Sequence, residues 1–162
     1  MADVFSKAKR SIVMASIRDR STKPELIVRK FVRYMGYSFR SNVGSLPGKP
    51  DIVIPKIRTV LQVRGCFWHG HKCLDGRVPG THRNYWKKKI QSNKARDLRN
   101  DRRLRRAGWH VKTIWECRIR TANVIGLHQL MLRLVDNRGC SARLTPRQAA
   151  RIDSDIAAVR DR

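Results

Sequence analysis

Apolar residues recur at helical spacing after the polar stretch Thr22-Lys23-Pro24-Glu25, at Leu26, Ile27, Phe31, Val32 and Met35. This spacing places them on one face of a helix. Thr22 can cap the first turn, proline is tolerated there, and Glu25 lies three residues after the cap, where it can complete a capping box. Gly36 is suited to end the helix. Capping is therefore a sufficient structural explanation for Glu25.

Short apolar and β-branched runs, separated by proline and glycine, predict strands next. Residues 37–41 form the first run, residues 51–54 form a second that opens on Asp51, and residues 59–64 form a third. The turn between the first two runs is Leu46-Pro47-Gly48-Lys49-Pro50.

A long basic helix is predicted over residues 84–106, and an apolar strand over residues 109–115. A strand, a long helix and a strand in this order form a crossover unit, which makes strands 59–64 and 109–115 parallel neighbours in one sheet. Another helix is predicted over residues 122–134.

The composition adds a large excess of positive charge. The 162 residues include 37 Lys and Arg against 12 Asp and Glu, which gives a formal net charge of +25. So much like charge in a small domain is self-repelling unless a polyanion binds. Nucleic acid is the first candidate partner. A membrane surface is the second, although the sequence has no long apolar segment.

The chain length fits one domain, which we place over residues 1–136, followed by a basic C-terminal tail over residues 137–162 that can hold a helix from Pro146. Residues 1–20 are weakly amphipathic, and they form either a helix that becomes ordered on DNA or one that caps the core. The N-terminus is polar and charged, unlike a signal peptide. We therefore expect reduced cysteines and a cytoplasmic, nucleoid-associated location.

The stretch from Arg64 to Cys73 concentrates metal-binding side chains. Cys66, His71 and Cys73 follow a C-x4-H-x-C spacing, and a closed tetrahedral zinc site needs one more ligand. Cys117 is the best candidate, because the predicted parallel pairing brings it back beside the loop. The alternatives are a disulfide between the two loop cysteines, which fits poorly with a chain that nothing marks as secreted, or unrelated buried thiols with structural histidines.

Phe67, Trp68 and His69 lie between the first two of these ligands, where zinc does not require them. We interpret the loop as one that zinc folds and that presents two rings and a histidine to nucleic acid. The remaining cysteine, Cys140, is predicted to be a spare thiol.

Asp51 is the most informative carboxylate in a chain with few acids. It lies at a strand mouth, between a proline turn and a second strand that ends beside it. Metal-dependent nucleases use such a carboxylate to hold a hard divalent ion against the scissile phosphate, where the ion polarises the phosphoryl oxygen. The alternative is that Asp51 only caps the turn after Pro50.

Six motifs occur in a fixed order from the first helix to the last predicted strand: Thr22-Lys23-Pro24-Glu25, Leu46-Pro47-Gly48-Lys49-Pro50-Asp51, Gly65-Cys66-Phe67-Trp68-His69-Gly70-His71, Tyr85-Trp86, Gly108-Trp109 and Trp115-Glu116-Cys117. Together they closely resemble the very short patch repair DNA mismatch endonucleases. The resemblance runs from about Lys9 to Cys117 and does not reach the C-terminal tail. Its Gly-Cys-Phe-Trp-His segment is highly specific.

The resemblance implies an α/β fold with a restriction-endonuclease-like core of the PD-(D/E)XK type, in which helices flank a central mixed sheet and a structural zinc ion is bound. It also implies magnesium-dependent nicking of the thymine strand in double-stranded DNA, next to a T:G mismatch left by deamination of 5-methylcytosine. We expect a monomer, because one catalytic centre cuts one strand.

Carried over position by position, the resemblance also implies roles for single residues. Asp51 would bind the catalytic magnesium, together with the backbone carbonyl of Val63. His69 would be the general base or acid near the attacking water, and Glu25 would hold water around the ion. The zinc ligands would be Cys66, His71, Cys73 and Cys117. The wedge inserted beside the mismatch would consist of Phe67, Trp68 and Trp86, with Met14 helping from the opposite groove.

Arg64 departs from the family pattern, which usually has a second histidine at this position. Arginine does not donate a proton near neutral pH, since its pKa lies above about 12, but it can clamp the scissile phosphate or stabilise the leaving oxygen. Gln62 and Val63 also do not supply the Glu-x-Lys pair of many restriction-type nucleases. Two alternatives stay open: a site- or structure-specific nicking or restriction endonuclease of the same fold, and a zinc-stabilised DNA-binding module that has lost catalysis.

Overall fold

A computed structural model describes residues 9, 12, 21–135 and 145–160 of the chain. Its centre is a three-stranded sheet, in which the strands β1 (Ile52–Ile54), β2 (Thr59–Arg64) and β3 (His110–Trp115) lie in the order β1-β2-β3. β1 and β2 are antiparallel, whereas β2 and β3 are parallel. The protein therefore has a small α/β fold with a mixed sheet, and the predicted crossover between the last two strands is confirmed.

The parallel pairing of β2 and β3 brings the ends of both strands to the same edge of the sheet. Arg64, the last residue of β2, lies opposite Trp115, the last residue of β3. Parallel strands run in the same direction, so the segments that follow them start side by side. Cys66 and Cys117, each two residues beyond its strand, are carried to one place in this way.

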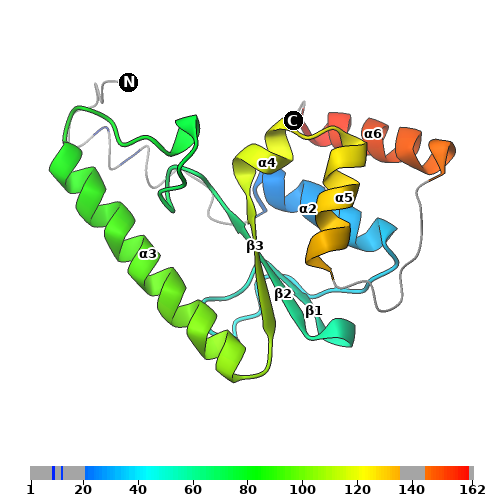
Figure 1. Cartoon of the computed structure of the whole chain (residues 1–162), viewed down its shortest axis with the longest axis horizontal. Helices are drawn as coiled ribbons and strands as arrows, with labels where there is room; N and C mark the ends of the chain where they lie inside the picture. Colours follow the sequence, from blue (N-terminus) through cyan, green and yellow to red (C-terminus); the bar gives the residue numbers. More distant parts are fainter. Residues whose placement is uncertain (1–8, 10–11, 13–20, 136–144, 161–162) are drawn as a thin grey trace.

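Helices cover both faces of the sheet (Figure 1). The long crossover helix α3 (Arg83–Arg106) lies along one face, while α2 (Lys23–Tyr34), α4 (Glu116–Thr121), α5 (Val124–Leu134) and α6 (Pro146–Arg160) gather on the other. No helix in the described ranges is long and apolar enough to cross a membrane.

The larger hydrophobic core lies between the sheet and the helices opposite α3. Its buried members include Phe31, Ile52, Leu61, Ile114, Met131 and Ile156. A smaller cluster under α3 consists of Val53, Val60, Leu104 and Val111. Successive strand residues point to opposite faces, and both faces are covered here, which explains why the strands read as nearly continuous apolar runs.

Helices α2 and α6 begin where the sequence predicts. Thr22 and Glu25 form the expected capping box at the start of α2, and Gly36 follows this helix with a positive φ of 78°. A helix does begin at Pro146, and it buries Ile152, Ile156 and Val159 in the larger core.

The structure differs from the expectation at two places. Residues 37–41 form no strand, because only Arg40 pairs with Val53, in an isolated bridge. Asn42 has a positive φ of 51°, which turns the chain out of the extended conformation directly after the bridge. Helix α4 was not predicted, since six residues are too few to reveal a helical period.

Candidate active site and metal centre

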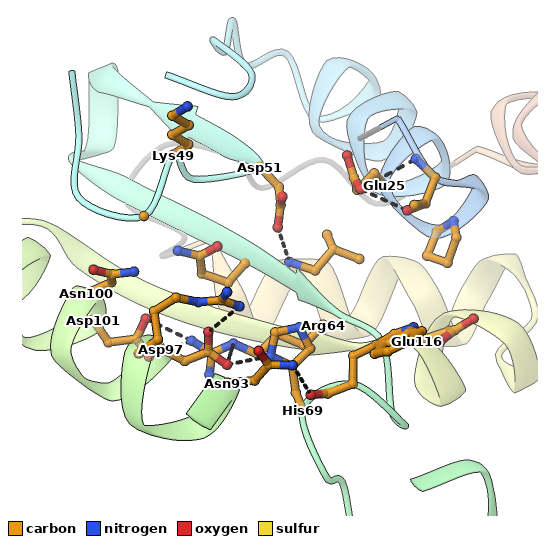
Figure 2. A pocket seen from close by; sticks show the side chains of 18 of the residues that line it. Glu25, Lys49, Asp51, Arg64, His69, Asn93, Asp97, Asn100, Asp101 and Glu116 are labelled. Carbon is orange, nitrogen blue, oxygen red and sulfur yellow. Dashed lines mark hydrogen bonds and ion pairs between the residues drawn. The ribbon is translucent and has the colours of Figure 1, made fainter. Parts of the chain in front are cut away.

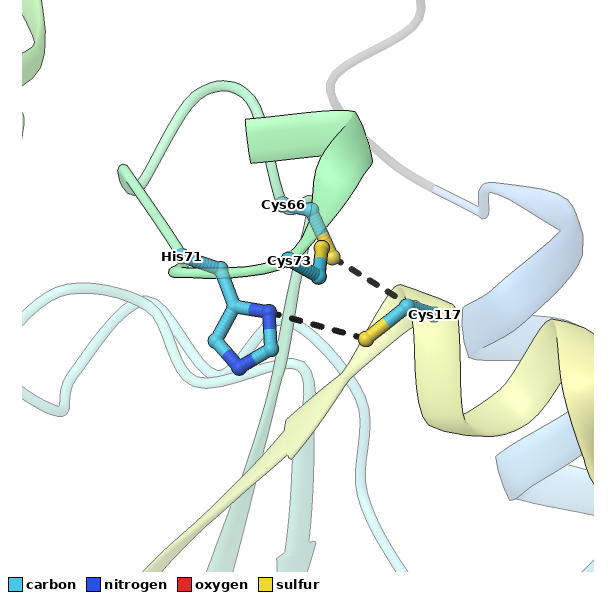
Figure 3. A group of neighbouring side chains, drawn as sticks. All are labelled: Cys66, His71, Cys73 and Cys117. Atoms are coloured by element: carbon cyan, nitrogen blue, oxygen red, sulfur yellow. Dashed lines mark hydrogen bonds between the residues drawn. The ribbon is translucent and has the colours of Figure 1, made fainter. Parts of the chain in front are cut away.

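The four predicted zinc ligands converge at the end of the sheet (Figure 3). The ligand atoms of Cys66, His71, Cys73 and Cys117 all lie within 4.8 Å of one another. In a tetrahedral site with Zn–S bonds of about 2.3 Å, the ligand atoms are about 3.8 Å apart, so the cluster is nearly closed around such an ion. Cys66, Cys73 and Cys117 are free thiols, which excludes the disulfide alternative in this structure. The group is suited to a soft or borderline cation.

Local hydrogen bonds tie the two halves of this cluster together. The backbone N–H of Cys117, in the first turn of α4, donates to the sulfur of Cys66 over 3.4 Å. Burial raises the pKa of the Cys66 thiol to about 12, whereas His71 lowers the pKa of Cys73 to about 7. Without a cation the buried thiol keeps its proton, so metal binding must release it.

Gly76 provides a test of how tightly the metal-binding loop is folded. A Cβ atom at this position would lie 1.9 Å from the backbone oxygen of His71, so the backbone that carries one ligand would have to move. We expect Gly76→Ala to lower the bound metal per chain and to destabilise the protein by about 1–3 kcal/mol, a typical cost of overpacking. Metal analysis and thermal unfolding measure both effects.

Gly80→Ala is the matched control, because no atom of the residues that the structure describes lies within 4 Å of a Cβ built at Gly80. It should behave as wild type. Wild-type metal content and stability in Gly76→Ala would show that the loop adapts and that its folding is looser than the structure indicates.

A cavity of about 830 Å³ lies beside the metal centre (Figure 2). Residues from α2, from β2, from the turn before β1, from the metal-binding loop and from α3 line it. The structure thus brings together the four residues that the family resemblance singled out for magnesium and catalysis, Glu25, Asp51, Val63 and His69, and places Arg64 beside them.

Asp51 lies directly before β1 and is held by β2. Its Oδ2 accepts a hydrogen bond of 2.8 Å from the backbone N–H of Val63, and its Oδ1 has no donor in the described part of the chain. The pKa of this carboxyl is raised to about 6, mainly by burial and to a smaller extent by Glu25, although the Val63 N–H, Arg29 and His69 act in the opposite direction. A half-buried carboxylate with one free oxygen is a suitable ligand for a hard cation.

Glu25 combines a structural role with a position in the cavity wall. Its side chain is 3% exposed and accepts hydrogen bonds from Ser21 N (3.0 Å), Thr22 Oγ1 (2.9 Å) and Arg29 Nη2 (3.0 Å). The capping explanation for Glu25 is therefore confirmed. The same carboxylate also lines the cavity that contains Asp51.

His69 is oriented by an acid that the sequence reading missed. Its Nδ1 is hydrogen-bonded to Oδ2 of Asp97, on α3. Burial opposes ionisation of Asp97, but the hydrogen bond and charge of His69, together with Arg64 and Arg96, hold the pKa of this carboxyl below its usual range. An ionised carboxylate only accepts hydrogen bonds, so the proton lies on Nδ1 and Nε2 is left free to exchange a proton.

Arg64 is bound to the same helix. Its Nη2 lies 2.8 Å from both carboxylate oxygens of Asp101, and its Nε lies 3.9 Å from Oδ2 of Asp97. Asp97 and Asp101 are the only acidic residues of α3. They are four residues apart, and therefore share one helix face, which was the signal available in the sequence.

The three predicted wedge rings pack against one another. The ring centroid of Phe67 lies 5.1 Å from that of Trp68 and 5.1 Å from that of Trp86, and both pairs are arranged edge to face. Trp86 is only 4% exposed, and its indole nitrogen has no hydrogen-bond partner among the described residues. Any insertion of Trp86 into DNA would therefore require this cluster to open. Met14 lies outside the described residues.

Comparison with known proteins adds independent information. Residues 2–75 match the family described as DNA mismatch endonuclease Vsr. The type II nicking enzyme V.NmeAIP of Neisseria meningitidis is 42% identical over 120 residues, which cover 74% of this chain and 86% of that protein. For V.XorIIP of Xanthomonas oryzae, also a type II nicking enzyme, identity is 44% over 119 residues, with 74% and 88% covered. DNA mismatch endonuclease Vsr of Escherichia coli is 42% identical over 120 residues, with 74% and 77% covered.

Proposed function

The chain belongs to the Vsr family of DNA mismatch endonucleases and is a DNA endonuclease, and from this premise we propose that it nicks the thymine strand of duplex DNA next to a T:G mismatch, such as deamination of 5-methylcytosine leaves. The observation that carries the proposal is the convergence of Asp51, Glu25 and His69 on one cavity beside a basic helix. A DNA-binding module without catalysis has no need of all three. A cytoplasmic location, with the DNA, follows from this substrate.

Magnesium is the proposed catalytic ion, with Asp51 and the carbonyl of Val63 as its protein ligands. The N–H and C=O groups of one strand residue point to the same side of the strand. The Val63 carbonyl therefore faces the side on which its N–H meets Asp51. Two oxygen donors suit magnesium, which supplies charge to stabilise the transferred phosphate group. This acid at a strand mouth supports a core of the PD-(D/E)XK type, although Gln62 and Val63 do not supply its Glu-x-Lys pair.

His69 is the proposed proton-transfer group. Asp97 fixes its Nδ1 proton and leaves Nε2 to accept a proton from the attacking water or to donate one to the leaving oxygen. A histidine held in this way keeps one ring nitrogen available for general acid–base catalysis. Glu25 would hold water at the cavity wall beside Asp51.

Zinc is the proposed ion of the Cys66, His71, Cys73 and Cys117 cluster, because three thiolates and one imidazole are a common structural zinc set. It would fold the loop that presents His69 and the aromatic rings. Basic side chains of α3 would grip phosphates without reading sequence. Rings inserted at a mismatch meet a smaller stacking penalty than at paired DNA.

A duplex labelled on each strand tests the proposal. One form carries a single T:G mismatch in a pool of randomised flanking sequences, and the control is fully paired; both are incubated with magnesium. We expect a nick on the thymine strand of the mismatched duplex only. Intact binding with no cleavage of any mismatch in the pool would contradict mismatch nicking.

A second candidate is nicking of a defined sequence without a mismatch. Two of the similar proteins are named type II nicking enzymes, which is the observation that favours it. The fully paired pool distinguishes the candidates, because a nick at one sequence in paired DNA would support this reading instead.

The magnesium requirement should depend on pH. The pKa of Asp51 is raised to about 6, so below this pH a proton occupies the carboxyl and competes with the ion. We expect the magnesium concentration for half-maximal nicking to be clearly higher at about pH 5.5 than at about pH 7.5. A change in the plateau rate with an unchanged midpoint would reflect groups other than the magnesium ligand. Identical midpoints at both pH values would argue against Asp51 as the ligand.

A further inference from the structure

Arg64 is the residue at which this chain departs from its family, and the structure points to its role. We propose that Arg64 is a positioning residue: it ties the end of β2 to α3 through Asp101 and, through Asp97, holds the ring of His69 in place. In this role it does not meet the scissile phosphate. The inference rests on the proposed function of His69.

The guanidinium group of Arg64 is already paired with the carboxylate of Asp101. One guanidinium nitrogen lies 2.8 Å from both carboxylate oxygens, and the side chains of Arg64 and Asp101 are 15% and 8% exposed. Charge-assisted hydrogen bonds of this kind are among the strongest in proteins. Moving Arg64 onto a phosphate would leave Asp101 charged, buried and unpaired, which is strongly unfavourable.

A second contact links Arg64 to the histidine. Oδ2 of Asp97 accepts the hydrogen bond from His69 Nδ1 and lies 3.9 Å from Nε of Arg64. Asp97 and Asp101 are one turn apart on α3, so Arg64 reaches along the helix face that also holds His69. The carboxylate that orients the histidine is therefore itself placed by the arginine.

The position of Arg64 in the chain makes this link effective. It ends β2 opposite Trp115, and the metal-binding loop with His69 begins directly after it. Without the pairing of Arg64 with Asp101, the metal-binding loop would be joined to α3 only by contacts that the loop residues make themselves. One of these is the hydrogen bond of 3.0 Å from Asn93 to the Trp68 carbonyl.

The cavity offers other cations for a phosphate. Lys49 and Lys89 line it, and neither forms an ion pair with a residue that the structure describes. A DNA phosphate can therefore be bound in the cavity by cations that need not leave a carboxylate. This removes the need for Arg64 as the clamp.

The test compares Arg64→Ala, Asp101→Ala and the double variant, with the milder Arg64→Lys and Asp101→Asn in case the alanine variants fold poorly. Arg120→Ala is the control, because Arg120 also pairs with an aspartate, Asp75, but lies outside the cavity. Single-turnover nicking at saturating enzyme and the Kd for mismatched duplex are measured separately.

A positioning role predicts similar rate losses in both single variants, of up to about 100-fold as small misplacements of catalytic groups produce, with Kd changed less than about threefold. The double variant should be no slower than either single one, since both remove the same link. If Arg64 instead contacts the phosphate, Asp101→Ala should keep or increase the rate while Arg64→Ala weakens binding. That result would overturn the proposal.

A measurement that needs no cleavage separates this inference from the proposed function. The Nδ1 proton of His69, identified by its absence in His69→Gln, should give a low-field NMR signal because of its bond to Asp97. We expect the signal to shift or vanish in Arg64→Ala and Asp101→Ala and to persist in Arg120→Ala. An unchanged signal in Arg64→Ala would refute the positioning role, even if wild-type protein cuts no duplex at all.

Discussion

Asp51→Asn will abolish nicking and leave DNA binding close to that of wild type. Asparagine keeps the shape of the side chain and an oxygen that can accept the Val63 N–H, but it has lost the charge that a hard cation requires. Because a bound metal ion stabilises the transition state by several kcal/mol, the rate of nicking should fall by about 1000-fold or more without it. Single-turnover nicking and Kd measurements test this.

The stability of the same variant gives an internal check. The pKa of Asp51 is raised above its unfolded value, mainly by burial. The charged form is therefore disfavoured in the folded protein, and stability is lost as pH rises through about 6. Asp51→Asn removes this cost, so without magnesium its unfolding temperature near neutral pH should equal or exceed that of wild type.

Asp153→Asn, an exposed site on α6, is the matched control and should change neither activity nor stability. A lower unfolding temperature in Asp51→Asn would assign its inactivity to misfolding. Nicking that persists in a folded Asp51→Asn protein would remove Asp51 from the catalytic site.

Cys117→Ser will lose the bound metal and much of the stability of the protein. Cys117 is the only one of the four clustered ligands that comes from beyond α3, so its loss opens the site and separates the loop from α4. Structural zinc contributes about 10–16 kcal/mol to isolated zinc fingers. In a chain with a hydrophobic core of its own, we expect a smaller loss, of at least about 3 kcal/mol.

Metal analysis and denaturant unfolding measure these two effects, and Cys140→Ser is the control. Cys140 was predicted to take no part in the site and lies outside the described residues. The Cys140→Ser variant should retain one metal ion per chain. A Cys117→Ser protein that retains its metal would show that the cluster holds the ion with three ligands.

Local signals in the sequence were sufficient for much of the architecture. The order strand, long helix, strand allows only one common hand and pairing, and this order alone predicts that Cys117 lies beside Cys66. The capping box of Glu25 is equally local. The predicted strand over residues 37–41 was wrong, because strand pairing depends on the turn of the chain at Asn42. Residue propensities do not contain that information.

The partners of His69 and Arg64 were beyond the reach of the sequence. Their contacts with Asp97 and Asp101 depend on the rotation of α3 about its axis relative to the sheet, which long-range packing sets. The sequence showed two acids on one face of a basic helix, but not which way that face points. From the sequence, Arg64 was therefore interpreted as a cation that is free to bind a phosphate, whereas in the structure it is paired with a carboxylate.

The inward orientation of these two acids also affects how the enzyme finds its target. With Asp97 and Asp101 directed at His69 and Arg64, the two acids of α3 offset few of the many Lys and Arg side chains on the rest of the helix, and only Arg96 lies near one of them, 3.8 Å from Asp97. A uniformly cationic surface binds any stretch of backbone about equally well, which permits sliding along the duplex. A mismatch is rare among millions of intact base pairs, so the enzyme would search for it by sliding along the duplex. The rate of this search would depend on how long the protein stays bound to the DNA in each salt-sensitive sliding event.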